Sequence, residues 1–328
     1  MLSEPAVILK RASGRLADTK DADRLALWYG LICIAVTAVS FAIEYTADTQ
    51  VENYGGLSHM GIRSVLSSIS MFVPVVRSLL LMCLNLGYCA AMLRVARGQY
   101  VSPKTLRAGW ERFFPMLRMT LLEALLLIGL GAAASYAASA IYMISPLASG
   151  LVETLEPLLS GSASDVLTLD DASMSALNSA MLPLLVIWGV LFAAVSIPLL
   201  YSYRMANYIL IEQGHRGGRF ALRESRRLMK GSRLRLLKLD LRFWWYYLLN
   251  GLAVCLCFGD LFFSRAGIHF PWSDSVSAIL FYLLYLLADL AVICFFRNRV
   301  GSAYACAYDD LCPKEKTDSV VLGNIFQM

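Results

Sequence analysis

Six stretches of this chain are apolar for long enough to cross a lipid bilayer. An α-helix rises about 1.5 Å per residue and the hydrocarbon layer is about 30 Å thick, so a crossing needs about 20 residues. Backbone polar groups that face lipid must be paired within their own segment, and a helix achieves this. We therefore expect an all-α membrane protein whose six-transmembrane-helix bundle is built from residues 25–43, 72–93, 119–143, 182–203, 243–263 and 276–296.

The composition agrees with lipid as the solvent of much of the chain. Hydrophobic residues make up 58% of the sequence and charged residues only 16%, whereas about a quarter of the residues of a soluble domain are charged. The net charge of +5, taken alone, would suit a nucleic-acid partner. The basic residues are concentrated in alternate connecting segments, however, and this distribution indicates membrane topology. We therefore expect no nucleic acid partner.

Basic residues also give the expected orientation, because short segments rich in Lys and Arg stay on the cytoplasmic side of a membrane. The two terminal segments and the loops 94–118 and 204–242 together carry 26 of the 29 basic residues. This pattern predicts a multi-pass protein of the bacterial cytoplasmic (inner) membrane with both termini in the cytoplasm. Residues 1–24 are then a cytoplasmic segment, 25–296 the membrane domain and 297–328 a cytoplasmic tail.

The cytoplasmic segments are expected to contain amphipathic helices at the level of the lipid headgroups. Ser3 as a cap, with Pro5 in the first turn, predicts a short helix near the N-terminus. Ser102 followed by Pro103 predicts another. Residues 219–229 place apolar side chains on one face and arginines on the other. Such a helix typically lies at the interface with its basic side toward anionic headgroups.

Residues 233–242 allow two interpretations. Their near alternation of apolar and polar residues, RLRLLKLDLR, taken alone favours a strand. A single strand at this position would leave its backbone unpaired beside lipid. Because the segment continues directly into the span at 243–263, we expect a helix.

A motif in the 204–242 loop resembles a known family. Residues 225–231 read SRRLMKG and residues 236–243 read LLKLDLRF, so a helix, a glycine stop and a new spanning helix follow in fixed register. In these residues the chain is similar to a bacterial membrane protein family catalogued as domain of unknown function 975. It departs from the family at Arg242, where serine is usual, and so looks like a divergent member. The resemblance implies an integral membrane protein without an assigned activity, and its motif residues here are Ser225, Met229, Gly231, Leu239, Leu241 and Phe243.

The motif also has a purely architectural interpretation. Ser225 is small enough for close helix packing, and the flexible side chain of Met229 can fill irregular gaps. Gly231 can adopt a positive φ where a helix ends. We expect these residues to shape the fold.

Four ionisable side chains lie inside the expected spans, where each costs about 2.5–3.5 kcal/mol on insertion scales. Arg77 and Asp260 lie near the outer ends of their spans, so their side chains can reach water. Glu123 and Asp289 lie in the inner half of the bilayer. We expect both to face the bundle interior, with basic partners at the inner helix ends, namely Arg94, Arg204 or Arg242. Without a partner, a desolvated carboxylate would bind a proton more readily and could serve a transporter.

Motifs for catalysis and for cofactor binding are missing from the sequence. It has no Gly-x-Ser-x-Gly elbow, no phosphate-binding loop and no His-Glu-x-x-His pair. Its eight cysteines and three histidines lack the spacing of a four-ligand zinc site. We therefore expect no enzyme, no cofactor and no metal.

The expected function is that of a non-catalytic scaffold or accessory subunit. It would contact anionic lipid headgroups and a membrane or cytoplasmic protein at the cytoplasmic face. The alternative is a small-solute or lipid transporter that uses a polar cluster in the inner half of the bilayer.

Overall fold

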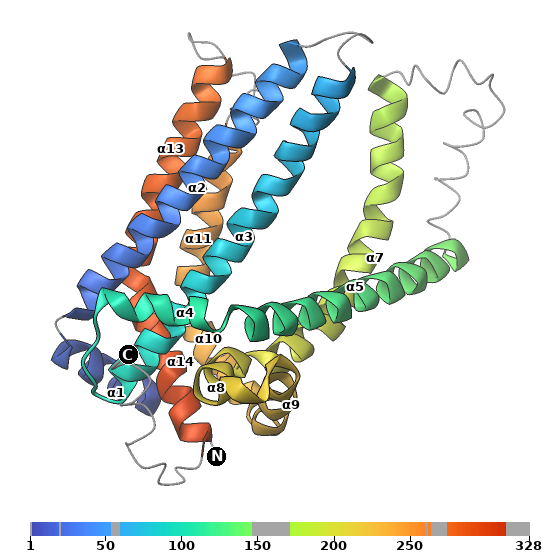
Figure 1. Ribbon diagram of the computed structural model, residues 1–328. Coiled ribbons are helices and arrows are strands. Elements are labelled where there is room, and N and C mark those ends of the chain that lie inside the picture. Colours follow the sequence, from blue (N-terminus) through green and yellow to red (C-terminus); the bar gives the residue numbers. More distant parts are fainter. Residues whose placement is uncertain are drawn as a thin grey trace. The chain divides into compact units, whose positions relative to one another are not determined.

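The computed structural model describes residues 2–19, 21–53, 60–145, 171–259, 262–263 and 274–312, and the described residues form helices joined by turns, without a strand. They make two compact units: residues 1–116 with 205–328, and residues 117–204. The prediction of an all-helical fold is confirmed. The order of the helices along the chain can be followed by colour in Figure 1.

Within the described residues, five helices are long and apolar enough to span a membrane. They overlap with α2 (Asp21–Asn53), α3 (Met60–Ala96), α5 (Phe113–Ile144), α7 (Asp171–Tyr203) and α13 (Asp274–Val292). The remaining expected span, 243–263, is described as a shorter apolar helix, α11 (Trp244–Cys257). Asp260, one of the four intramembrane candidates, lies outside the described residues.

In the first unit, α2 lies beside α3, and α11 lies beside α13 (Figure 1). Large apolar side chains on α2 and α3 are exposed, among them Val39, Val65 and Phe72. Such a surface is costly in water but is solvated by acyl chains, because lipid tails are as apolar as these side chains. Five apolar helices of spanning length therefore indicate a membrane protein.

Two glycines let a short connecting segment pack directly on α3. The segment consists of a 3₁₀ helix, η2 (Pro103–Arg107), followed by α4 (Ala108–Glu111). A Cβ atom on Gly87 would lie 2.1 Å from the carbonyl oxygen of Leu106, and one on Gly109 would lie 1.9 Å from that of Cys83. The amphipathic helix expected after Ser102 is thus two short helices, and Ser102 forms no side-chain cap hydrogen bond.

The motif in loop 204–242, the fourth loop between the expected spans, forms α9 (Gly218–Leu228) and α10 (Arg233–Arg242). The prediction of a helix over residues 233–242 is therefore confirmed. Gly231 has a φ of +84° between them, as expected for a glycine that ends a helix. Five of the six motif residues support packing: Ser225, Met229, Leu239 and Phe243 are buried, while Gly231 makes the turn. Leu241 is the exception, because its side chain is exposed.

The N-terminal helix α1 (Pro5–Asp18) packs against protein. Its N-cap residue is Glu4 and not Ser3, which corrects the expected cap, and Pro5 lies in the first turn. Ile8 and Ala12 are buried where α1 meets α14 and α10. The sequence near Pro5 was interpreted as a helix lying on lipid, but its buried face is occupied by other helices.

The chain does not leave the helix at residue 297, where the sequence suggested the start of a tail. A π-helical turn, Ile293–Arg297 (labelled η4), continues into α14 (Asn298–Leu311). Small residues explain the burial of this helix, since a Cβ atom on Gly301 would lie only 2.9 Å from Cγ of Met92 on α3. The buried residues of α14 are Asn298, Val300, Ser302, Ala303, Tyr304, Ala305, Cys306, Ala307, Tyr308 and Leu311.

The second unit contains most of α5 and the described part of α7. Trp188 on α7 donates from Nε1 to the carbonyl oxygen of Gly131 at 3.3 Å, and its ring stacks on Phe192 with centroids 5.3 Å apart. Apolar side chains such as Leu125 and Ile128 on α5 are exposed. This surface is again one that lipid solvates better than water.

Candidate functional site

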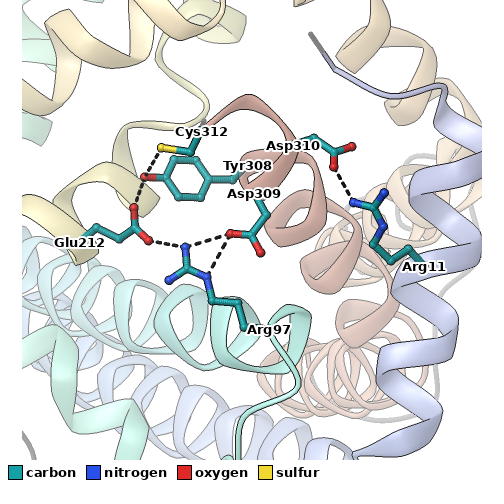
Figure 2. A network of polar contacts seen from close by, with 7 residues as sticks. All are labelled: Arg11, Arg97, Glu212, Tyr308, Asp309, Asp310 and Cys312. Carbon is teal, nitrogen blue, oxygen red and sulfur yellow. Dashed lines mark hydrogen bonds and ion pairs between the residues drawn. The ribbon is translucent and has the colours of Figure 1, made fainter. Parts of the chain in front are cut away.

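The candidate site is a network of charged and polar side chains around the C-terminal part of α14. Arg97 follows α3 directly, and Gly98 with a φ of +70° then turns the chain away. Glu212 comes from α8 (Ala206–Gln213). Tyr308 and Asp309 come from α14. The network therefore joins three helices that are far apart in the sequence, as Figure 2 shows.

The contacts of this network are direct. Arg97 donates to Oδ1 of Asp309 from Nη2 at 2.9 Å and from Nε at 3.0 Å. The same Nη2 also donates to Oε1 of Glu212. Tyr308 donates its hydroxyl proton to Oε2 of Glu212 at 2.6 Å, and the thiol of Cys312 lies 3.7 Å from that hydroxyl. We call Arg97, Glu212, Tyr308, Asp309 and Cys312 the inner polar network.

The electrostatics of the inner polar network keep Arg97 charged. Burial lowers the pKa of Arg97, but the hydrogen bonds to Asp309 and the attraction of Glu212 outweigh it, so the pKa is raised overall. A guanidinium held by two carboxylates is a strong, directional contact. Burial raises the pKa of the Cys312 thiol, which therefore favours its protonated form.

A second ion pair flanks the network. Arg11 on α1 donates to Oδ1 of Asp310, the residue after Asp309 (Figure 2). The hydrogen bond and the attraction between the two side chains raise the pKa of Arg11. The adjacent acids Asp309 and Asp310 thus each bind an arginine from a different part of the chain. Both contacts hold α14 against its neighbours.

The first turns of α14 carry another set of polar contacts. Asn298 accepts a hydrogen bond from the hydroxyl of Tyr88 at 2.9 Å and donates to the carbonyl oxygen of Ala22 at 2.9 Å. The guanidinium carbon of Arg297 lies 4.5 Å from the ring centroid of Tyr29 and 5.1 Å from that of Tyr88. Cation–π contacts of this kind stabilise a charge away from water.

Asp240, a neighbour of the family motif, is also bound to α14. It accepts hydrogen bonds from the hydroxyls of Tyr304 and, at 3.1 Å, Tyr247. The carboxylate is buried. A buried carboxylate is stable only when such donors satisfy it. The end of α10 is therefore bound to α14, the helix that Arg97 and Glu212 also contact.

Of the four intramembrane candidates, the structure describes Arg77, Glu123 and Asp289. Nη1 of Arg77 on α3 lies 3.8 Å from Oε1 of Glu44 on α2, so the two side chains form an ion pair between these helices. Asp289 is half-buried on α13, and in the described part of the first unit it forms no ion pair with Arg94 or Arg242.

Glu123 lies on α5 in the second unit and is half-buried. Among the described residues of that unit it forms no ion pair with Arg204, which is exposed. The pairing of Glu123 with Arg94 or Arg242 stays a prediction.

Sequence reasoning missed the inner polar network. Asp309 and Asp310 lie in the segment 297–328, which the sequence predicted to be a cytoplasmic tail. Arg97 and Glu212 lie 115 residues apart, and no local spacing connects them. The one available signal was Glu212 itself, an acid in the most basic loop of the chain, because an isolated acid among cations often has a specific partner.

Two cavities lie in the first unit. The first, of about 670 Å³, lies between α2 and α3 and is lined mainly by aliphatic side chains. The second, of about 1010 Å³, is bounded by α1, the start of α2 and the η4–α14 region, and its lining is both polar and apolar. Among the described residues, no group of three or more His, Cys, Asp or Glu side chains is arranged to hold a metal ion.

Comparisons with known proteins match the family resemblance noted in the fourth loop. A family model described as a protein of unknown function, DUF975, matches residues 10–299. No curated protein and no solved structure matches the chain. The family match covers the second part of α1, the apolar helices and the motif in loop 204–242.

Proposed function

Because the chain belongs to DUF975, a family of proteins of unknown function, we propose its role from the geometry of the inner polar network. The role is that of a non-catalytic scaffold or accessory subunit in the bacterial cytoplasmic membrane. The observation that carries the proposal is the simultaneous contact of Arg97 with Asp309 and Glu212. A guanidinium bound to two carboxylates of its own chain holds helices together and is not free to bind a solute.

The proposal includes six spans, with α11 and the residues that follow it as the fifth. The apolar sequence of 243–263 supports this, since its length of about 20 residues suits a bilayer. An even number of spans also agrees with the charge bias, which favours both termini in the cytoplasm.

The proposed contact surface is the outer face of α9. Arg219, Arg223 and Arg226 are exposed on this helix, while Ala221 and Ser225 are buried against the protein. Basic side chains at the inner membrane surface attract anionic headgroups, worth about 1 kcal/mol each. The same face can bind an acidic surface of a membrane or cytoplasmic protein.

Affinity capture from native membranes tests the scaffold proposal. We expect a protein that co-purifies with the wild type to be lost from the double variant Arg223→Gln/Arg226→Gln. The matched control is Lys104→Gln/Arg107→Gln, which removes two exposed cations from η2. Equal capture by all three proteins would contradict the proposed role of α9.

A transporter is the second candidate, and the placement of Asp289 favours it. This half-buried carboxylate on α13 has no ion pair in the described part of its unit, and such residues occur in proton relays. Uptake measured in proteoliposomes, with Asp289→Asn beside the wild type, distinguishes the two roles. Proton-coupled uptake that the substitution abolishes, with folded yield unchanged, would favour transport over the scaffold.

A further inference from the structure

The residues that line the cavity of about 1010 Å³ beside α1 all belong to the first unit. α1 supplies one wall, the first turns of α2 another, and the η4–α14 region the third. Ligand pockets typically have volumes of about 300–1,000 Å³. The cavity is therefore large enough for a sizeable ligand.

The position of α1, one wall of this cavity, is secured by contacts outside the cavity. Arg11 pairs with Asp310 on α14. Arg235 on α10 donates to the carbonyl oxygen of Leu2. Ile8 is buried on the packed face of α1. The cavity is thus formed by the fold before any ligand binds.

The lining changes from polar to apolar in the same direction along two helices. On α2, Asp23 is followed one helical turn later by Leu27. On the other wall, Phe295 is followed at helical spacing by Arg299 and Ser302. Because Leu27 and Phe295 belong to the apolar stretches and the polar residues lie beyond their ends, the polar end of the cavity lies at the membrane surface.

The polar end carries an excess of positive charge. The side chains of Lys10 and Arg299 are exposed there and form no ion pair within the described residues. The one lining carboxylate, Asp23, accepts a hydrogen bond from Nδ2 of Asn298 at 3.3 Å. The hydroxyl groups of Ser13 and Ser302 add polar atoms beside the two cations.

The apolar end is exposed to a degree that water would not tolerate well. The side chain of Leu27 is 48% exposed and that of Phe295 is 69% exposed. An acyl chain would cover both. A cavity with two cations at one end and exposed apolar side chains at the other matches an amphiphile with an anionic headgroup.

We propose that this cavity binds one anionic phospholipid of the inner leaflet, with its phosphate between Lys10 and Arg299 and an acyl chain along Leu27 and Phe295. This inference deepens the proposed lipid contact and rests on the proposed cytoplasmic position of α1. It assigns that contact to a defined site in place of a general attraction of the basic surface. The bound lipid would also connect α1 to the membrane-spanning helices.

The test is lipid binding by the purified full-length protein in nondenaturing detergent, followed by native mass spectrometry during titration with phosphatidylglycerol. Removing one cation should weaken binding about fivefold, since each is worth about 1 kcal/mol near a membrane surface. The double variant Lys10→Gln/Arg299→Gln should therefore bind about 25-fold more weakly. The control Lys104→Gln/Arg107→Gln, with the same loss of charge, should bind like the wild type.

Three results would overturn the inference. Equal weakening in both double variants would mean attraction by net charge. If phosphatidylcholine bound as tightly as phosphatidylglycerol, the site would not select for an anionic headgroup. Full displacement of the lipid by inorganic phosphate would mean a site for a free anion.

The folding of each variant is checked by thermal unfolding. The variant Leu27→Ser, which keeps both cations, should also weaken lipid binding.

The outcome is separable from that of the scaffold proposal. Lipid titration uses no protein partner, so it can succeed while capture through α9 fails. Lys10 and Arg299 are absent from the α9 surface, so loss of lipid binding in their double variant leaves the capture experiment unaffected.

Discussion

Nη2 of Arg97 lies 2.9 Å from Oδ1 of Asp309, although the two residues are 212 positions apart in the sequence. This contact joins the end of α3 to the end of α14, and Glu212 on α8 binds the same guanidinium. The last described helix is therefore bound to one of the first. Its charged residues, which an isolated tail would expose to water, contribute to the packing where these helices end.

Removing one partner of this pair should destabilise the protein. We expect Arg97→Met or Asp309→Asn to lower the free energy of unfolding by about 1–3 kcal/mol, because a partly buried charge is left without its hydrogen bonds. A double-mutant cycle measured by thermal unfolding in detergent gives their coupling energy. Arg24→Met is the control, since that side chain is 82% exposed beside Asp21. A coupling energy near zero would contradict a stabilising contact between Arg97 and Asp309.

Gly109 should not tolerate a side chain. Alanine would bring its Cβ atom 1.9 Å from the carbonyl oxygen of Cys83, so α4 must move away from α3. Overpacking of this kind typically costs about 1–3 kcal/mol. Gly14→Ala on α1 is the matched control, because its added Cβ atom would meet nothing within 4 Å. That change should be neutral or stabilising by about 0.5–1 kcal/mol, and equal melting temperatures for both variants would refute the prediction.

The thiol of Cys312 should react slowly with alkylating reagents. Burial raises its pKa in the folded protein, and only the thiolate is nucleophilic. A variant that retains Cys312 as its sole cysteine should therefore show a rate–pH profile displaced to higher pH relative to the same protein unfolded in SDS. Below the raised pKa the folded protein reacts more slowly, and the difference closes as pH rises through it. Coincident profiles would mean that the thiol is not shielded.

Reporter fusions should map the fourth loop to the cytoplasm. The charge bias predicts cytoplasmic activity for a fusion after Lys230 and exterior activity for one within residues 144–181. Fusions of two reporters at the same positions distinguish the two sides of the membrane. Alkaline phosphatase is active at the exterior, and green fluorescent protein fluoresces in the cytoplasm. High phosphatase activity after Lys230 would reverse the proposed topology, and with it the expected side of the lipid site.

Local sequence patterns were sufficient for several elements. Apolar length predicted the long helices, because lipid-exposed backbone has few alternatives to a helix. The stop at Gly231 followed from the freedom of glycine to adopt positive φ, and the structure gives it a φ of +84°. Even the alternating residues 233–242 were correctly interpreted as a helix once the neighbouring span was taken into account.

Patterns along the chain were least informative beyond residue 296. Gly301, Ala303, Ala305 and Ala307 are too small and too weakly apolar to stand out as a span. The three alanines are buried, and a Cβ atom on Gly301 would lie 2.9 Å from Met92 and 3.0 Å from Tyr88 on α3. A stretch of small residues next to charges has the same composition whether it is a solvated tail or a packed helix.

The amino-acid sequence by itself determined the solvent, the helical class and the expected orientation, since each depends on the length of apolar runs and on which loops are basic. Only the tertiary structure decided which charges meet. Arg97, Glu212 and Asp309 come from three separate segments, and their contact depends on how helices pack. Ion pairs act over a few ångströms in space, whereas their partners here are separated by about a hundred residues or more of chain.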